Sequence, residues 1–434
     1  MDPRGADGAG HWGRIFQRDI LQGIGSSGVA LAVTLFTTPM MTRLFPAEAY
    51  GAYGLINTTA TVVSGFGLLG LPVALARAQA GAEQARLLTA SIQVAAILCA
   101  LLVAGAVFVY LGSPDGVAGV SVGVILLLPL LVLCHAGQRI SDSLAGAQGL
   151  FPELAAARIV GAISTRGLTL AAGWMVQASA GAMVVGDAVG KALHIAVTAM
   201  RGSLGATWRT LPRSIEKESL YAILRDYSDF ALYSNLATIL PLVMVLGLQA
   251  LVGERYGVGA TGQFVLAQSI LSLPVTLLAM ASAPVIFYRL VRAADEAPEN
   301  LLGLVLRAMF AFLVLGAISM LPIALFGPSL FAFVFGEPWR QSGVLAAALS
   351  LPQVMSFSLT ALLSLFRVTR RLRFWLGLEV LGSVLVVGGF AMFSYEQDFT
   401  SAIGDMAWLL LIYQVLMHMG FLFVVCRHRG TRDE

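Results

Sequence analysis

Three charged residues lie deep inside two apolar runs of this sequence. Arg166 lies near the middle of the run Leu154–Val176, and Asp187 and Lys191 lie in the run Ala180–Met200. A charge in hydrocarbon costs from about 3 kcal/mol upward, so each of these residues needs a partner or a function. Asp187 and Lys191 are four residues apart, the helical spacing at which two side chains meet.

Two interpretations of this group stay open at this point. Two bases and one acid could bind a pyrophosphate or an acidic sugar, with Asp187 as a candidate proton or ion site. Alternatively, Asp187 and Lys191 neutralise each other and hold the helices together. The unmatched positive charge of Arg166 favours anion binding slightly.

The elements that would carry these residues are membrane-spanning helices. Hydrophobic residues make up 58% of the 434 residues and charged residues 12%, and the mean hydropathy is +0.83. A spanning helix needs about 20 mostly apolar residues, and runs of that length recur about twelve times. We therefore predict an all-α integral membrane protein with helices at Ile20–Leu44, Tyr50–Ala76, Leu87–Leu111, Val117–Gly137, Leu154–Val176, Ala180–Met200, Phe230–Val252, Gly262–Tyr288, Leu301–Phe326, Ser342–Phe366, Phe374–Tyr395 and Ala402–Cys426.

These helices fall into two pseudo-symmetric halves. Tyr50-Gly51 follows the first helix and Tyr256-Gly257 follows the seventh, and the two pairs are about half the chain apart. Parallel repeats of this kind are typical of alternating-access transporters. We predict the following division: an N-terminal tail at 1–19, a six-helix bundle at 20–200, a linker at 201–225, a second six-helix bundle at 226–426 and a C-terminal tail at 427–434.

Basic residues indicate the orientation. Cytoplasmic connections of membrane proteins are enriched in lysine and arginine. Among the connections between helices, numbered in chain order, the odd ones contain only Arg43, Arg255 and Arg340. The tails and the even connections contain most of the others, among them Arg14, Arg209, Arg213, Arg292, Arg370, Arg371, Arg373 and Arg427. Both tails and the linker are therefore predicted to be cytoplasmic.

Two segments of the first half resemble a known family. The run from Thr38 to Gly54 (TPMMTRLFPAEAYGAYG) and the stretch from Phe66 to Pro72 (FGLLGLP), followed by Arg77, are similar to polysaccharide-type (Wzx-like) flippases. These proteins belong to the MOP exporter superfamily. The resemblance implies two six-helix bundles around a V-shaped cavity, lined by the first, second, seventh and eighth helices. It also implies a bacterial inner-membrane flippase that moves an undecaprenyl-pyrophosphate-linked oligosaccharide, for surface or exopolysaccharide synthesis.

The candidate substrate-binding residues combine charge and polarity. Relatives often place cations on the first two helices, whereas here Arg43 and Arg77 lie only near the helix ends. Hydroxyl and amide groups on the expected cavity helices suit sugar hydroxyls, although such groups also link helices to each other. The candidates are Arg166, Lys191, Asp187, Arg43, Asn57, Thr34, Asn235 and Gln268.

Other functions are less consistent with the sequence. An ion-coupled multidrug or small-solute antiporter of the same fold would favour aromatic residues and a buried acid in the cavity. A membrane glycan polymerase would need a nucleophile and a base in a long periplasmic loop, and none is present, so we expect no enzyme. Three cysteines within apolar runs suggest no metal site, and no phosphate-binding loop indicates a nucleotide. We expect no cofactor and no nucleic-acid partner; the expected partners are the lipid-linked oligosaccharide, membrane lipids and other glycan-assembly proteins.

Overall fold

The computed structural model describes residues 25–26, 28–76, 78, 81–112, 116, 119–201, 220–296, 298–362, 366, 371–395 and 397–430. These residues form helices joined by short connections. The predicted tail 1–19, most of the predicted linker 201–225 and Arg77 lie outside the described residues. The helices are a first helix at Gly28–Leu44, then α2 (Ala47–Gly67), α3 (Leu71–Leu75), α4 (Ala82–Gly112), α5 (Val122–Ile125), α6 (Leu128–Ala147), α7 (Phe151–Met175), α8 (Ala180–Arg201), α10 (Leu220–Tyr256), α11 (Val258–Glu296), α12 (Pro298–Phe335), η1 (Glu337–Trp339), α13 (Arg340–Leu362), α15 (Leu372–Phe393) and α16 (Phe399–Gly430).

The helix number agrees with the prediction. Ten segments of the described chain are long and apolar enough to cross a membrane. The first helix is apolar, with 17 residues described, and α2 is a further long helix of 21 residues. Each of the twelve predicted runs therefore corresponds to a helix, and the chain is a multi-pass membrane protein.

Several predicted boundaries were wrong. The fourth run was expected to end at Gly137, but α6 continues to Ala147. The second run was expected to be one helix, but it is interrupted after α2, where Leu69 (φ 51°) and Gly70 (φ 77°) are left-handed. Helix α11 has 39 residues and is therefore about 58 Å long, about twice the thickness of the hydrocarbon core. Arg289 and Arg292, expected in a connection, lie in this extension.

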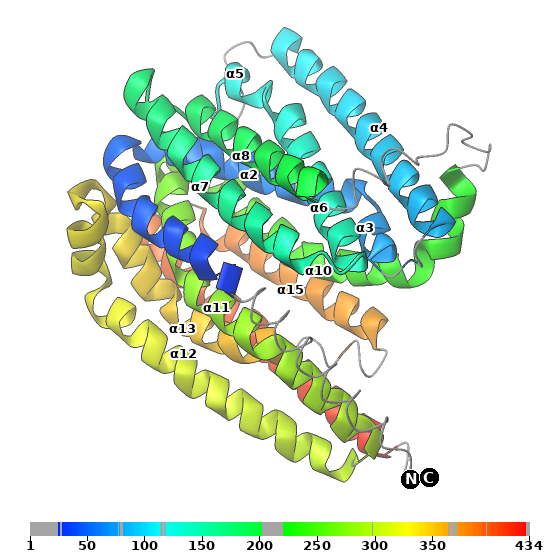
Figure 1. Ribbon diagram of the computed structural model, residues 1–434. Helices are drawn as coiled ribbons and strands as arrows, with labels where there is room; N and C mark the ends of the chain where they lie inside the picture. The colour runs from blue at the N-terminus through cyan, green and yellow to red at the C-terminus, as the bar shows by residue number, and fades with distance from the viewer. Residues whose placement is uncertain are drawn as a thin grey trace.

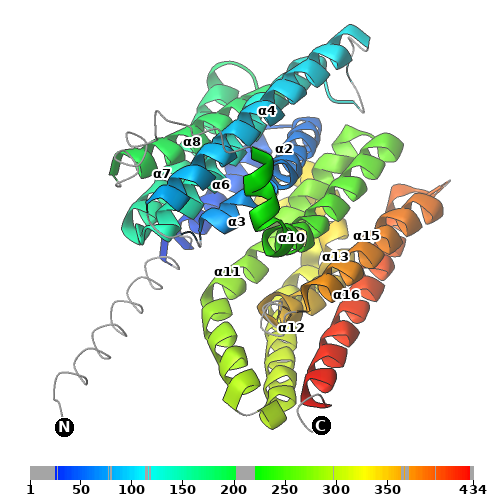
Figure 2. The same ribbon diagram turned by 90° about the vertical axis from the view of Figure 1, so that its right-hand side faces the viewer.

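The helices form two groups that follow the order of the chain. In Figure 1 the helices up to α8 occupy the upper part of the view, and α11, α12 and α13 occupy the lower part. Figure 2 keeps the same groups apart after a 90° turn, with α4, α7 and α8 on one side and α12, α15 and α16 on the other. We call them the N-terminal and the C-terminal bundle.

The two bundles make a close contact between α2 and α11. A Cβ added at Gly51 would overlap the carbonyl oxygen of Val258, and one added at Gly262 would overlap that of Ala47. Only glycine allows two helix backbones to approach this closely. Gly51 is the fifth residue of α2 and Gly262 is the fifth residue of α11, so the two helices meet near their starts.

Hydrogen bonds and an aromatic contact also join the two bundles, at the same end of the molecule as the contact between Gly51 and Gly262. The indole Nε1 of Trp339 donates to the carbonyl oxygen of Thr42 over 2.8 Å, and the hydroxyl of Thr42 donates to the carbonyl of Phe335 over 3.1 Å. The ring of Tyr50 meets that of Trp339 edge-on, with centroids 5.0 Å apart. Trp339, Thr42 and Tyr50 are all buried. We call this group the clasp; it joins the bundles at the end where the odd-numbered connections lie, which we call the outer end.

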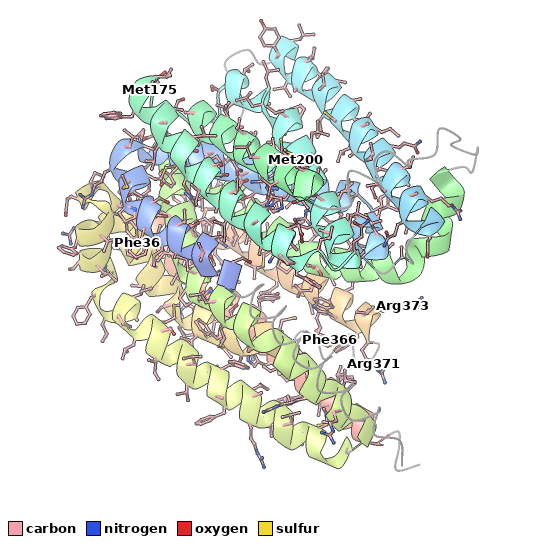
Figure 3. The ribbon with its side chains drawn as sticks, viewed as in Figure 1. Phe36, Met175, Met200, Phe366, Arg371 and Arg373 are labelled. Atoms are coloured by element: carbon pink, nitrogen blue, oxygen red, sulfur yellow. The ribbon has the colours of Figure 1, made fainter. Side chains whose placement is uncertain are left out.

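The even-numbered connections are expected at the opposite end of the molecule, which we call the inner end. Figure 3 shows Arg371 and Arg373 on the far side of the molecule from Phe36 and Met175. Arg371 and Arg373 lie at the start of α15, directly after an even connection, and Met175 ends α7 before an odd one. These two connections therefore lie at opposite ends, as expected. Which end faces the cytoplasm stays a prediction from charge.

Cysteine labelling tests this orientation. In a chain whose Cys99, Cys134 and Cys426 are replaced by serine, we expect Gln397→Cys at the outer end to react with an impermeant maleimide added to intact cells. Ser214→Cys, in the predicted linker, should react only after the membrane is permeabilised, because positively charged segments stay inside. Labelling of the Ser214→Cys variant in intact cells would contradict the predicted orientation.

Candidate functional site

Close packing of α7 against α8 sets the position of the predicted charged group. A Cβ at Gly186 or Gly190 would overlap the hydroxyl of Thr169 or Thr165 respectively, and the latter would also lie 2.7 Å from the Thr165 amide nitrogen. The two glycines have the small-xxx-small spacing of tightly packed membrane helices. Asp187 and Lys191 each follow one of these glycines and therefore lie at the edge of the α7–α8 contact.

This edge borders a cavity of about 440 Å³. Its walls come from the first helix, α2, α6, α7 and α8, with one residue from α11. Among the described residues, the polar and charged ones that line it are Thr34, Tyr53, Asn57, His135, Gln138, Arg158, Thr165, Arg166, Asp187, Lys191, His194 and Thr276. Arg158, Arg166 and Lys191 outnumber the single carboxylate among these, so we call it the cationic cavity.

The predicted pairing of Asp187 with Lys191 is present. Lys191 Nζ donates to Asp187 Oδ1, and the two side chains are 15% and 6% exposed. Asp187 Oδ2 is buried without a hydrogen-bond partner in the described part of the chain. Arg166 lines the same cavity from α7. A buried ion pair gives little net stability, but loss of one partner leaves a costly buried charge.

Two histidines add polar contacts that the sequence did not reveal. His135 Nε2 lies 3.1 Å from Asn57 Oδ1, and His194 Nε2 lies 2.7 Å from Asp142 Oδ1. Because both oxygens can only accept, Nε2 carries the proton in each ring. These bonds connect α6 to α2 and to α8, and they fix the orientation of Asn57 in the cationic cavity.

The structure brings together five of the eight candidate residues. Thr34, Asn57, Arg166, Asp187 and Lys191 line the cationic cavity.

The other three candidates lie elsewhere. Asn235 donates its Nδ2 to the carbonyl of Gly65 over 2.9 Å, linking α10 to α2. Gln268 borders a second cavity of about 290 Å³ inside the C-terminal bundle. Arg43 is exposed beside Leu170 and Trp174 at the outer end.

The second cavity contains a buried carboxylate, that of Glu379. This residue is 2% exposed. It accepts hydrogen bonds from Trp375 Nε1 over 2.9 Å and from the hydroxyl of Tyr413 over 2.8 Å. These two donors compensate for part of the cost of removing a carboxyl group from water. Across the described residues, no group of three His, Cys, Asp or Glu side chains could hold a metal ion.

The fold is that of MATE-type membrane transporters. The chain is similar to a multidrug resistance MATE family transporter of the MOP superfamily in its inward-facing conformation, with 16% identity, a TM-score of 0.67, and coverage of 94% of this chain and 96% of that one. It is similar to the lipid II flippase MurJ in an inward closed conformation, with 12% identity, a TM-score of 0.71 and coverage of 93% and 89%. It is also similar to a multidrug resistance MATE family transporter in its outward-facing conformation, with 16% identity, a TM-score of 0.62, and coverage of 96% of this chain and 96% of that one. No curated protein sequence matches the chain.

The sequence itself shows the family. The profile described as "Polysaccharide biosynthesis protein" matches residues 40–344, well over half of the chain. The chain therefore belongs to this family of polysaccharide biosynthesis proteins. This membership confirms the resemblance seen in the runs around Tyr50 and Gly67. The matched region includes most of the walls of the cationic cavity.

The α7–α8 contact leads to a stability prediction. Gly190→Ala should lower the stability of the protein in detergent by about 1–3 kcal/mol, because the new methyl group overlaps Thr165 and the backbone must shift. Gly167→Ala on α7 is a matched control, since a Cβ there meets no atom within 4 Å. Thermal unfolding of the two purified variants compares them. Equal stability would show that the helices are not packed as closely as described.

Proposed function

We propose that this protein is a flippase that moves an undecaprenyl-pyrophosphate-linked oligosaccharide across the bacterial inner membrane by alternating access. The pyrophosphate and the sugars would enter the cationic cavity, while the polyprenyl chain stays in lipid. The oligosaccharide would serve surface or exopolysaccharide synthesis, in keeping with the family. Expected partners are this substrate, membrane lipids and other glycan-assembly proteins.

The excess of positive charge in the cationic cavity carries the proposal. Arg166 and Lys191 line the cavity with the single carboxylate of Asp187, and Arg158 lines it as well. Arginine guanidinium groups bind phosphate oxygens through paired, charge-assisted hydrogen bonds. The nearby amide of Asn57 and hydroxyl of Thr34 suit sugar hydroxyl groups.

The clasp supports the transport mechanism. It holds the bundles together at the outer end, so that a substrate in the cationic cavity would be separated from the outside. Outward opening would require the Trp339–Thr42 bond to break and the glycine contact between α2 and α11 to separate. Contacts would then have to form at the inner end to exclude the cytoplasm.

The alternatives have less support. A multidrug antiporter would have to admit cationic compounds, and the three bases that line the cavity would repel them. The similarity to the MATE transporter in its inward-facing conformation concerns the fold alone, at 16% identity. A glycan polymerase would need a nucleophile and a base in a long periplasmic loop, and the described connections at the outer end are short.

A flipping assay tests the substrate class. Deletion of the gene should abolish a surface or secreted glycan and leave lipid-linked oligosaccharide facing the cytoplasm. Arg166→Gln should reproduce much of this loss at normal protein levels, since it removes a phosphate-binding charge. Arg307→Gln is the control, because Arg307 is exposed on α12 away from the cavity. Intact glycans in the deletion strain, together with sensitivity to cationic drugs, would favour the antiporter.

The Asp187–Lys191 pair allows a separate test. Lys191→Ala alone leaves a buried unpaired carboxylate and should lower expression, because breaking such a pair typically costs about 3–5 kcal/mol. The double change Asp187→Asn with Lys191→Gln removes both charges and should restore expression. If Lys191 binds the pyrophosphate, the double variant remains inactive in flipping. Full transport by the double variant would reduce Lys191 to a structural role.

A further inference from the structure

Arg43 differs from the other bases predicted at the outer end. Arg255 donates to the hydroxyl of Ser394 and, over 2.6 Å, to the carbonyl of Ala391. Arg340 bonds both carboxylate oxygens of Glu337, over 2.6 and 3.1 Å. Within the described ranges, no side chain or carbonyl bonds Arg43. Its guanidinium group is therefore available to a ligand.

The surroundings of Arg43 form a furrow. It measures about 440 Å³ and is lined by Met40, Arg43 and Leu44 of the first helix and by Leu170, Ala171 and Trp174 of α7. Gly173 of α7 packs against Phe45 at the same end of the two helices. We call this the Arg43 furrow. One cation in an otherwise largely apolar lining suits an amphiphile with an anionic head and an apolar chain.

The rim of the furrow faces outward. Met40 is 59% exposed, Trp174 is 85% exposed, and Phe36, one turn before Met40, is 77% exposed. Figure 3 shows Phe36 on the same side of the molecule as Met175, the neighbour of Trp174. Tryptophan is enriched where the membrane meets water. The furrow therefore opens to lipid near the level of the headgroups.

The same two helices line the furrow and the cationic cavity. The first helix contributes Thr34 to the cavity and Met40 to the furrow. Helix α7 contributes Arg166 to the cavity and Leu170, one turn later, to the furrow. The cavity and the furrow therefore follow one another along the seam between the first helix and α7, and an arginine lines each of them.

We propose that the Arg43 furrow binds the diphosphate head and the first isoprenoid units of the lipid-linked product at the outer end of the seam between the first helix and α7. This inference rests on the proposed function and adds a second site to it. The guanidinium group of Arg43 binds the diphosphate oxygens, and Met40, Leu44 and Leu170 pack against the prenyl chain. Ordinary phospholipid is the competing occupant, and continuity with the cationic cavity favours the product.

Site-specific photocrosslinking tests this proposal. The full-length protein is placed in phosphatidylcholine nanodiscs with undecaprenyl diphosphate as the probe. A benzophenone amino acid replaces either Met40, in the furrow, or Leu31, which lines the cationic cavity. We expect crosslinks to the probe at both positions. Arg43→Gln should lower the crosslink at position 40 about fivefold, the effect of one partly exposed charge, and change the one at position 31 less than twofold.

Matched variants separate charge from damage to the fold. Arg340→Gln removes another exposed base of the outer end and should change neither crosslink. Arg43→Lys should retain part of the crosslink at position 40, because it keeps the charge without the paired donors.

The other outcomes discriminate between the two sites. A crosslink at position 31 alone would overturn the furrow and leave the proposed function intact. Crosslinks at neither position would contradict both. A crosslink at position 40 that Arg43→Gln does not change, or that phosphatidylglycerol at equal concentration abolishes, would overturn a specific product site.

Discussion

The contact between Gly51 and Gly262 determines how the two bundles fit together. Two helix backbones can approach this closely only where neither has a side chain, so the contact allows one register and one crossing point. Both glycines lie near the starts of their helices, so the contact joins the bundles at the outer end. The polar bonds of Trp339 and Thr42 can form only when this crossing is in place. The closed outer end therefore depends on two glycines, which have no side chain.

Charge is distributed unequally between the bundles. The N-terminal bundle carries the bases of the cationic cavity, whose walls are held in place by the α7–α8 contact and by the bond between His135 and Asn57. The C-terminal bundle buries the carboxyl group of Glu379 between Trp375 and Tyr413. A negatively charged substrate would interact favourably with one bundle and little with the other. Movement of the bundles against each other would therefore change the surroundings of a bound anion without releasing it from its ligands.

Much of this arrangement could be predicted from the sequence. The apolar runs give the helix number because a bilayer demands a nearly constant helix length, and the spacing of Asp187 and Lys191 gives their pairing because it is local to one helix. The positions of Asn235 and Gln268 depend on which face of each helix meets a neighbour, and the apolar pattern of a membrane helix does not encode this. His135 lies within the expected fourth helix, but a single histidine in an apolar run does not indicate its partner on another helix. Asp142 was missed because the fourth helix was expected to end at Gly137. Pro129 near the start of α6 and Gly149 just past its end (φ 70°) are the signals that could have located it.

The position of Trp339 has a consequence for following the protein in time. Its indole is 2% exposed and donates to a carbonyl of the opposite bundle, so separation of the bundles at the outer end would transfer it to water and exchange its hydrogen-bond acceptor. Indole emission responds to both changes. With the other five of the six tryptophans replaced by phenylalanine, the emission wavelength of Trp339 would report the open and closed populations without an attached dye. The clasp would then serve as a built-in optical probe of each transport cycle.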